Sequence, residues 1–276
     1  MAGTTDRKWG DPMKIMLVGD THGSTRDVKT KIDIAKRIGG IDRMVIVGDC
    51  GLWTGHEGVV FIDEINEYAR KNNIFIFMIR GNHDNTDWWH RAYEAARISG
   101  ATSKGFAYLR TNVLIAPTIH AWRWAGKQFA SAGGAVSIDK DYRLEYERKK
   151  GIKIWWDDEQ LTDDEVNDLI VGMGGIKTDY LLTHDCSDKT PFYGRLKPDH
   201  ESKIHRQRID RVLKGLNPRM HFHGHFHTRY EWENMVVSEN GEPHYIATFG
   251  LECNDDPDSW GILDTEDDSF VFATDM

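Results

Sequence analysis

The segment K-I-M-L-V-G-D-T-H-G at residues 14–23 decides the fold. An apolar run that ends in Gly-Asp predicts a short buried strand over Lys14–Val18, followed by a polar loop. The same pattern returns at residues 44–49, and a third apolar run covers residues 74–79. Apolar residues at helical spacing predict helices between these strands. The resulting β-α-β-α-β order implies parallel strands with right-handed crossovers, and it places the first two helices at 24–38 and 59–71.

The remainder of the chain is expected to continue as one α/β domain with a strand-rich second half. The patterns predict further helices at 85–99, 161–173 and 202–214, the last one ending at Gly215. They predict further strands at 118–124, 129–132, 180–183, 220–223, 230–232, 245–249, 260–263 and 270–273. We find no repeat and no low-complexity linker, so we expect a single domain over 13–276, preceded by a flexible lead-in over 1–12.

The composition narrows the class of protein. The chain has 276 residues and a formal net charge of −9, which argues against duplex nucleic acid as a partner. Its three cysteines are widely spaced and form no CxxC pair, which indicates a reducing compartment and predicts a cytoplasmic protein. No apolar stretch approaches the roughly 20 residues of a membrane span, and the first residues lack the apolar core of a signal peptide.

Chemically active residue types follow five of the predicted strands. The residues are Asp20 and His22, then Asp49, then Asn82, His83 and Asp84, then His184, and finally His225 and His227. Each motif alone is typical of a turn, a helix cap or a hydrogen-bonded loop histidine. Because the carboxyl ends of parallel strands meet at one crevice, five such motifs together predict one site.

The donor types predict a site for two metal ions. Mixed carboxylate, amide and imidazole donors suit Mn, Fe, Zn or Ni better than Ca or Mg, and we expect Mn. The absence of a cysteine cluster disfavours a structural zinc ion. Seven donors exceed what one tetrahedral ion needs, and they suit two ions about 3.5–4 Å apart that share a carboxylate.

These motifs resemble those of the calcineurin-like metallophosphoesterases: D-x-H at Asp20 and His22, G-D at Asp49, G-N-H-D at residues 81–84, a lone His184, and G-H-x-H at residues 224–227. The resemblance implies a four-layer α/β/β/α sandwich of two mixed sheets. It also implies that Asp20, His22, Asp49 and His227 hold one metal ion and that Asp49, Asn82, His184 and His225 hold the other. By the same resemblance, Asp49 bridges the two ions, His83 is catalytic, and Asp84 orients His83 and favours its imidazolium form.

The resemblance implies a metal-dependent phosphoesterase in which a hydroxide bound to both metals attacks the phosphate. We expect small phosphodiester or nucleotide substrates. The protein serine/threonine phosphatase branch has a different second motif and reads G-N-H-E at the third, so a phosphomonoesterase of that type is an alternative. A nuclease of the same family is another, and a non-catalytic metal-binding scaffold is the alternative from a different class.

Three further features carry weaker expectations. The pairs Trp88–Trp89 and Trp155–Trp156 can stack a nucleobase, but we expect them to serve packing. Arg143 can contact a substrate phosphate, but we expect a surface ion pair. The sequence leaves the oligomeric state open.

Overall fold

The computed structural model describes residues 11–191, 199–237, 241 and 243–276. Its helices are α1 (Thr25–Ile38), α2 (His56–Lys71), α3 (Thr86–Ser99), α4 (Lys140–Lys150), α5 (Asp163–Met173), α6 (His200–Leu216) and the 3-10 turn η1 (Ala273–Asp275). Its strands are β1 (Lys14–Val18), β2 (Ile41–Val47), β3 (Phe75–Ile79), β4 (Thr102–Ser103), β5 (Phe106–Tyr108), β6 (Val113–Ile115), β7 (Ile119–Trp124), β8 (Lys127–Ala132), β9 (Tyr180–Thr183), β10 (Met220–His223), β11 (Tyr230–Val237), β12 (Pro243–Gly250), β13 (Trp260–Asp264) and β14 (Ser269–Phe272).

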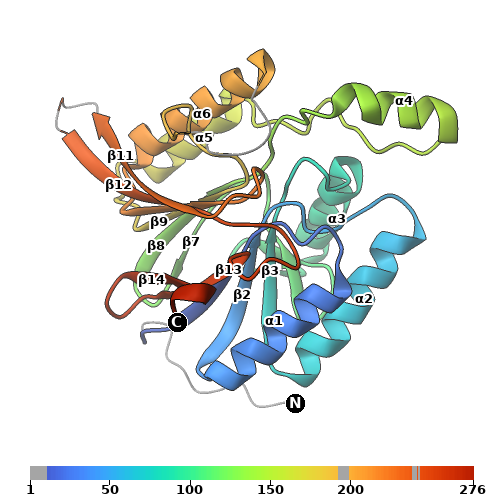
Figure 1. Ribbon diagram of the computed structural model, residues 1–276, viewed down its shortest axis with the longest axis horizontal. Helices are drawn as coiled ribbons and strands as arrows, with labels where there is room; N and C mark the ends of the chain where they lie inside the picture. The colour runs from blue at the N-terminus through green and yellow to red at the C-terminus, as the bar shows by residue number, and fades with distance from the viewer. Residues whose placement is uncertain (1–10, 192–198, 238–240, 242) are drawn as a thin grey trace.

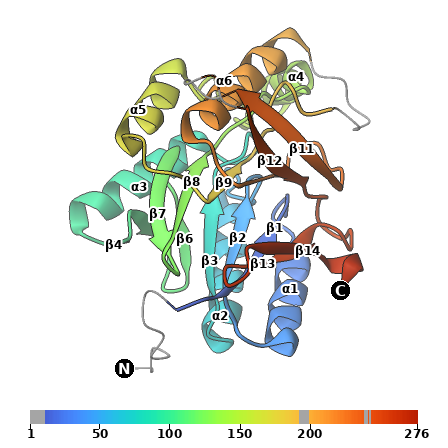
Figure 2. The same ribbon diagram turned by 90° about the vertical axis from the view of Figure 1, so that its left-hand side faces the viewer.

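Two mixed sheets form the centre of the molecule (Figure 2). The first has the strand order β14-β13-β1-β2-β3-β6-β5-β4, and its strands β1, β2, β3 and β6 are parallel. The second has the order β11-β12-β10-β9-β8-β7, with β8, β9, β10 and β12 parallel. Helices α1 to α3 lie on the outer face of the first sheet, and α5 and α6 lie on that of the second (Figure 1). The predicted four-layer α/β/β/α sandwich is therefore confirmed.

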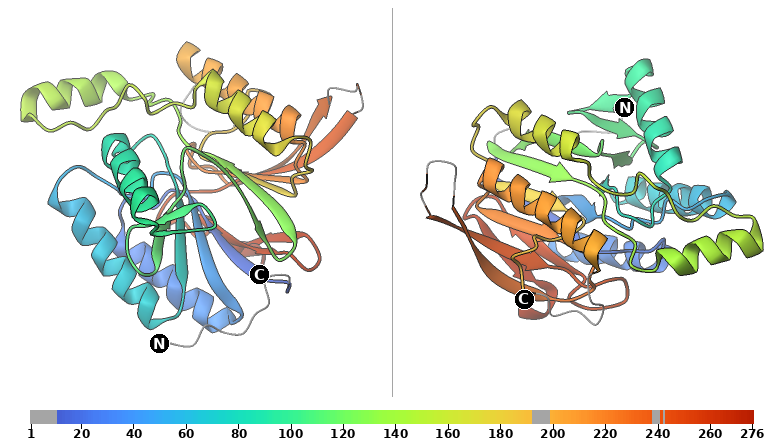
Figure 3. Two further views of the ribbon diagram at one scale, coloured as in Figure 1. Left: turned by 180° about the vertical axis from the view of Figure 1, so that it is seen from behind. Right: turned by 90° about the horizontal axis from the view of Figure 1, so that it is seen from above.

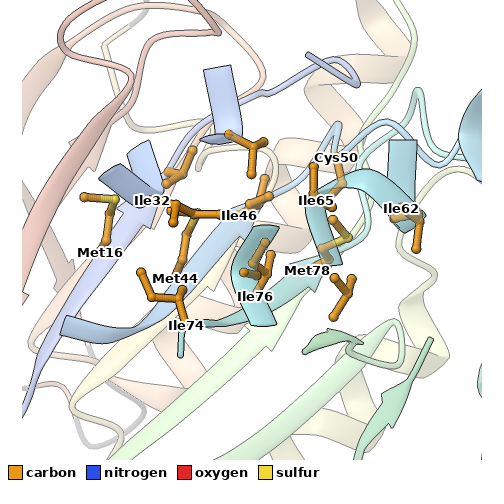
Figure 4. Packing of buried hydrophobic residues seen from close by; sticks show 14 of the residues in the cluster. Met16, Ile32, Met44, Ile46, Cys50, Ile62, Ile65, Ile74, Ile76 and Met78 are labelled. Atoms are coloured by element: carbon orange, nitrogen blue, oxygen red, sulfur yellow. The ribbon is translucent and has the colours of Figure 1, made fainter. Parts of the chain in front are cut away.

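Alternation along the strands builds the layers. In β1, Ile15 and Leu17 point into the core between the two sheets, whereas Met16 and Val18 pack beneath α1 and α2. Figure 4 shows the core between the first sheet and its outer helices, where side chains from the strands meet the apolar faces of the helices. A third core lies between the second sheet and the helix pair α5 and α6. Strands buried on both faces need continuous apolar runs, which is the pattern seen at residues 15–18 and 44–47.

Local signals determine several helix ends. Ser24 caps α1 by accepting a hydrogen bond from the backbone N–H of Asp27, and Thr162 and Glu165 form a complete capping box on α5. The prediction that the last long helix ends at Gly215 is wrong, because α6 continues to Leu216 and is closed by Asn217 in a left-handed conformation. The strand predicted over 230–232 is too short, because β11 pairs with β12 as far as Val237.

The predicted lead-in over 1–12 lies, for residues 1–10, outside the described residues, and the single-domain assignment stays a prediction. Within the described residues no helix has the length and apolar character to cross a bilayer. The cytoplasmic location stays a prediction too. The fold brings the loops after β1, β2 and β3 against the loops after β9 and β10, and these loops carry the five motifs.

Candidate metal centre

The predicted ligands come together where these loops meet. Three groups of side chains have ligand atoms that all lie within 4.8 Å of one another. The groups are Asp20 with His22 and His227, His22 with Asp49 and His83, and Asp20 with Asp49 and His184. Asp20, His22 and Asp49 each belong to two of these groups, and Asp49 is the residue that shares one group with His83 and another with His184. His225 belongs to none of these groups of carboxylates and imidazoles. It lies beside His184, as does the amide of Asn82.

The first donor cluster is formed by Asp20, His22 and His227. The Nε2 atoms of His22 and His227 lie 3.1 Å apart, and the Nε2 atom of His227 lies 3.0 Å from Oδ2 of Asp20. Two imidazole nitrogens and a carboxylate oxygen thus converge on one point. Imidazole and carboxylate are ligands that divalent transition metals accept readily, so this cluster fits one cation.

The second donor cluster is built around His184. Its Nδ1 donates to the carbonyl oxygen of Val47 at 2.9 Å, which fixes the ring and leaves Nε2 free to act as a ligand. That Nε2 lies 3.3 Å from Oδ1 of Asp49 and 3.0 Å from Oδ1 of Asn82.

His225 completes this side of the site. Its ring centroid lies 5.0 Å from that of His184. Its Nε2 atom is buried and has no hydrogen-bond partner among the described residues. Buried polar atoms almost always have a hydrogen-bond partner. A buried imidazole nitrogen without one, placed beside other donor atoms, is typical of a metal ligand. The residues present therefore fit a second cation.

Backbone strain is concentrated at these ligands. Four residues of the site have positive backbone φ angles: His22 (43°), Asp49 (45°), His225 (68°) and His227 (47°). These angles lie in the left-handed region, which residues other than glycine rarely adopt. Residues held there cost free energy, and they persist at functional sites where the surrounding structure imposes them. Four of the predicted ligands share this feature although they belong to three separate loops.

Two glycines let the loops approach this closely. A Cβ on Gly224 would lie 2.0 Å from Oδ1 of Asp20, and a Cβ on Gly48 would lie 2.0 Å from Nδ1 of His184. Neither distance is physically possible, so any side chain at either position would displace a ligand. The backbone N–H of His225, next to Gly224, donates to Asp20 at 3.0 Å and holds that carboxylate in place.

The electrostatics of the site favour positive charge. Burial alone raises the pKa of Asp20 and of Asp49, but the neighbouring imidazoles outweigh it and leave both below the usual range. Burial also opposes charge on His184, yet the two carboxylates raise its pKa to about 9. Without cations, protons on His184 and His227, whose pKa values the aspartates raise, offset the charge of the buried carboxylates. Divalent ions at the same place would supply that charge in their stead.

Comparison with known proteins agrees with this geometry. A family model described as calcineurin-like phosphoesterase matches residues 13–229. The chain belongs to the calcineurin-like phosphoesterases. Among solved structures, the TT1561 protein of Thermus thermophilus is 10% identical with a TM-score of 0.50, and the alignment covers 94% of this chain and 97% of that one. At this identity the likeness shows the fold.

Two further structures are similar at lower scores. Phosphopantetheinyl hydrolase from Mycobacterium tuberculosis is 9% identical with a TM-score of 0.48, covering 91% of this chain and 95% of that one. A predicted phosphoesterase from Streptococcus pneumoniae is 10% identical with a TM-score of 0.39, covering 96% and 92%. Comparison with curated proteins found no match.

In this phosphoesterase His83 lies at the open side of the centre. Its side chain is 38% exposed, and its Nε2 lies 3.8 Å from Oδ2 of Asp49. Its backbone N–H donates to Oδ1 of Asp49 at 2.8 Å, which ties it to the shared carboxylate. Burial and the nearby Arg143 guanidinium lower the pKa of His83, and Asp49 only partly offsets them. Without cations the neutral ring is therefore favoured.

Asp84 makes no direct contact with the His83 ring among the hydrogen bonds of its carboxylate, so any orienting effect on His83 acts through the backbone. Its buried carboxylate accepts four backbone hydrogen bonds, from the N–H groups of residues 50, 51 and 52 at 3.0–3.1 Å and from Gly81 at 2.8 Å. These bonds occupy the carboxylate, and none involves His83. Asp84 instead joins the loop after β2 to the loop after β3, so it positions Asp49 and His83 through the backbone.

The segment between β8 and α5 adds residues that the motif analysis missed. The amide of Asn82 donates to the Ser137 hydroxyl at 3.0 Å, and that hydroxyl donates to the Glu159 carboxylate at 2.6 Å. Glu159 also accepts from the backbone N–H of Ser137 at 2.7 Å. With its amide nitrogen held in this way, Asn82 turns its oxygen toward His184. Burial raises the pKa of Glu159 to about 7 despite these bonds. A lone Ser and a lone Glu carry no signal in sequence.

The ion pair expected for Arg143 is present, with Asp139 at 2.8 Å, but the arginine is buried and does not lie at the surface. The residue is 3% exposed, and its guanidinium contacts the His83 ring. The tryptophan pairs behave as expected where they are buried: Trp89 donates to the carbonyl of Ala116 at 2.8 Å, and Trp156 donates to Asp87 at 3.1 Å. Both serve packing.

Proposed function

We propose that this calcineurin-like phosphoesterase is a dinuclear metal-dependent hydrolase of phosphodiester or nucleotide-type substrates. The observation that carries the proposal is the set of three overlapping donor groups, two of which contain Asp49. Asp20, His22, Asp49 and His227 would hold one ion, and Asp49, Asn82, His184 and His225 would hold the other. The mixed oxygen and nitrogen donors suit Mn, Fe, Zn or Ni, and of these we propose manganese, with iron, zinc and nickel as alternatives.

When bound, divalent cations supply Lewis acidity, which lowers the pKa of a coordinated water and offsets the charge that develops on phosphate oxygens. The chain contributes the rest. Its strained loops hold the donors in place before substrate arrives, so little reorganisation is needed during the reaction. His83 stands at the open side of the site, where it can give a hydrogen bond or a proton to the leaving oxygen.

The substrate class rests on charge and on the motifs. A net charge of −9 favours a small anion over a long duplex, whose phosphates it repels. The loop after the second motif reads Cys50-Gly51-Leu52-Trp53 and the third motif ends in Asp84, both unlike the protein phosphatase branch. We therefore propose small phosphodiesters or nucleotides as substrates, in the cytoplasm.

The test is hydrolysis of bis-p-nitrophenyl phosphate by purified protein with added Mn²⁺, with EDTA as the control. We expect turnover that EDTA abolishes, and two metal ions per chain by elemental analysis. A panel of cyclic nucleotides, dinucleotides, phosphopeptides and single-stranded DNA then identifies the substrate class. No turnover with Mn²⁺, Fe²⁺, Zn²⁺ or Ni²⁺ would instead support a non-catalytic scaffold, and turnover confined to phosphopeptides would overturn the substrate class.

A further inference from the structure

Helix α4 is an unusual element of this fold. It projects from the body of the sandwich, as two opposite views show (Figures 1 and 3). Its sequence K-D-Y-R-L-E-Y-E-R-K-K is polar on nearly every face, and among its residues, all of which the structure describes, the buried one is the charged Arg143. Surface helices normally bury apolar residues, so packing alone does not explain why this helix turns an arginine inward.

The arm that carries Arg143 is held firmly at its base. Glu147 accepts hydrogen bonds from the backbone N–H groups of Ile154 at 2.7 Å and Trp155 at 2.6 Å, which tie the helix to the chain that returns from it. The hydroxyl of Thr54, from the loop after β2, donates to the carbonyl of Lys153 at 2.8 Å. These hydrogen bonds therefore fix the position of the helix that carries Arg143.

The guanidinium of Arg143 is oriented from three sides. Its Nε donates to Asp139 at 2.8 Å, and its Nη1 donates to the backbone carbonyls of Asn82 at 3.3 Å and Ile154 at 3.2 Å. Its Nη2 contacts Nε2 of His83. A guanidinium only donates, so His83 is the acceptor in this contact. The Nη2 end thus faces the ring that borders the metal centre.

This position is unfavourable unless an anion is present. A guanidinium beside a centre for two divalent cations is repelled by them, and its carboxylate partner within ion-pair distance, Asp139, has a side chain that is 41% exposed. A phosphate oxygen between the guanidinium and the metals reverses the sign of the interaction. Planar guanidinium groups match phosphate geometry well, which is why arginine is common at such sites.

We propose that Arg143 is a substrate-binding residue, whose Nη2 binds a non-bridging oxygen of the phosphate held at the metal centre. The arriving oxygen replaces Nε2 of His83 as the acceptor, so substrate binding also frees His83 to face the leaving group. Helix α4 is then the arm that brings the phosphate-binding group to the site. This inference rests on the proposed function for its substrate, but its test measures binding rather than turnover.

The test uses the full chain loaded with Zn²⁺ and inorganic phosphate as the probe, with affinity measured by calorimetry. We expect Arg143→Gln to weaken phosphate binding about 10–100-fold with unchanged metal content, because a charge-assisted hydrogen bond is lost. Arg143→Lys keeps the positive charge but lacks the planar array of donors of a guanidinium, so we expect an intermediate loss of phosphate affinity. Arg148→Gln, at an exposed position on the same helix, is the matched control and is expected to stay within about twofold.

Phosphate affinity of Arg143→Gln within about twofold of wild type would overturn the proposal. If turnover nevertheless fell in that variant, Arg143 would be a positioning residue for His83. If Arg143→Gln does not fold, the guanidinium resonances of Arg143 in wild-type protein decide: they are expected to shift when phosphate is added, and no shift would overturn the proposal. Arg143-dependent phosphate binding by a protein that hydrolyses no ester would support this inference while refuting the proposed function.

Discussion

Glu159→Gln is expected to change how the stability of the protein depends on pH. The side chain is 1% exposed, and burial raises its pKa from 4.5 to about 7 in the folded protein. In the unfolded chain it titrates near the ordinary value. Between these two values the folded state binds more protons than the unfolded state, so the free energy of unfolding falls as pH rises.

The size of the effect follows from the two pKa values. Each tenfold change in proton affinity is worth about 1.4 kcal/mol, so full ionisation of Glu159 costs about 3 kcal/mol. Below pH 4.5 the carboxyl is neutral in both states and the cost is absent, and above pH 7 it is complete. Between pH 5 and pH 8 wild type should lose about 2.5 kcal/mol through this group. Glutamine is neutral at every pH, so the variant does not lose this free energy of unfolding.

The assay is urea unfolding of both proteins between pH 5 and pH 8, with EDTA present so that metal binding does not contribute. We expect Glu159→Gln to gain about 2.5 kcal/mol relative to wild type across this interval. Glu145→Gln removes a carboxylate at an exposed position and corrects for the loss of one negative charge. If the curves for wild type and Glu159→Gln run parallel, the reasoning from burial is refuted.

Three further predictions concern the metal centre. Asp49→Asn should lose metal because this carboxylate belongs to two of the three donor groups and is proposed to bridge the two ions, and full occupancy by elemental analysis would disprove bridging. His83→Gln should keep both ions but lower turnover about 10²–10⁴-fold, so a rate close to wild type would exclude an acid-base role. Gly224→Ala should weaken metal binding in a metal titration because its Cβ would lie 2.0 Å from a ligand oxygen, whereas Gly172→Ala, in open space, should not.

The sequence by itself predicted which polar side chains gather at the candidate metal centre. Buried parallel strands must be apolar, so the polar residues directly after them stand out, as Asp20 and Asp49 do. The carboxyl ends of such strands meet, and this rule brings side chains as distant in the chain as His22 and His227 within 3.1 Å. The candidate ligands could be predicted because each belongs to a short motif at a strand end.

Only the tertiary structure decided what surrounds the ligands. Asp84 belongs to the third motif, yet its four backbone hydrogen bonds span two loops and no local pattern encodes them. Arg143 and Glu159 lie on the segment between β8 and α5, where the surrounding sequence is polar and lacks a strand-end signal. Their importance depends on how this segment folds back: Arg143 contacts His83, and Glu159 holds Ser137, which in turn bonds Asn82, more than fifty residues earlier in the chain. Contacts between residues so far apart in the chain depend on how the arm packs in the folded protein. The motifs of the candidate ligands, in contrast, consist of residues close together in sequence and can be recognised there.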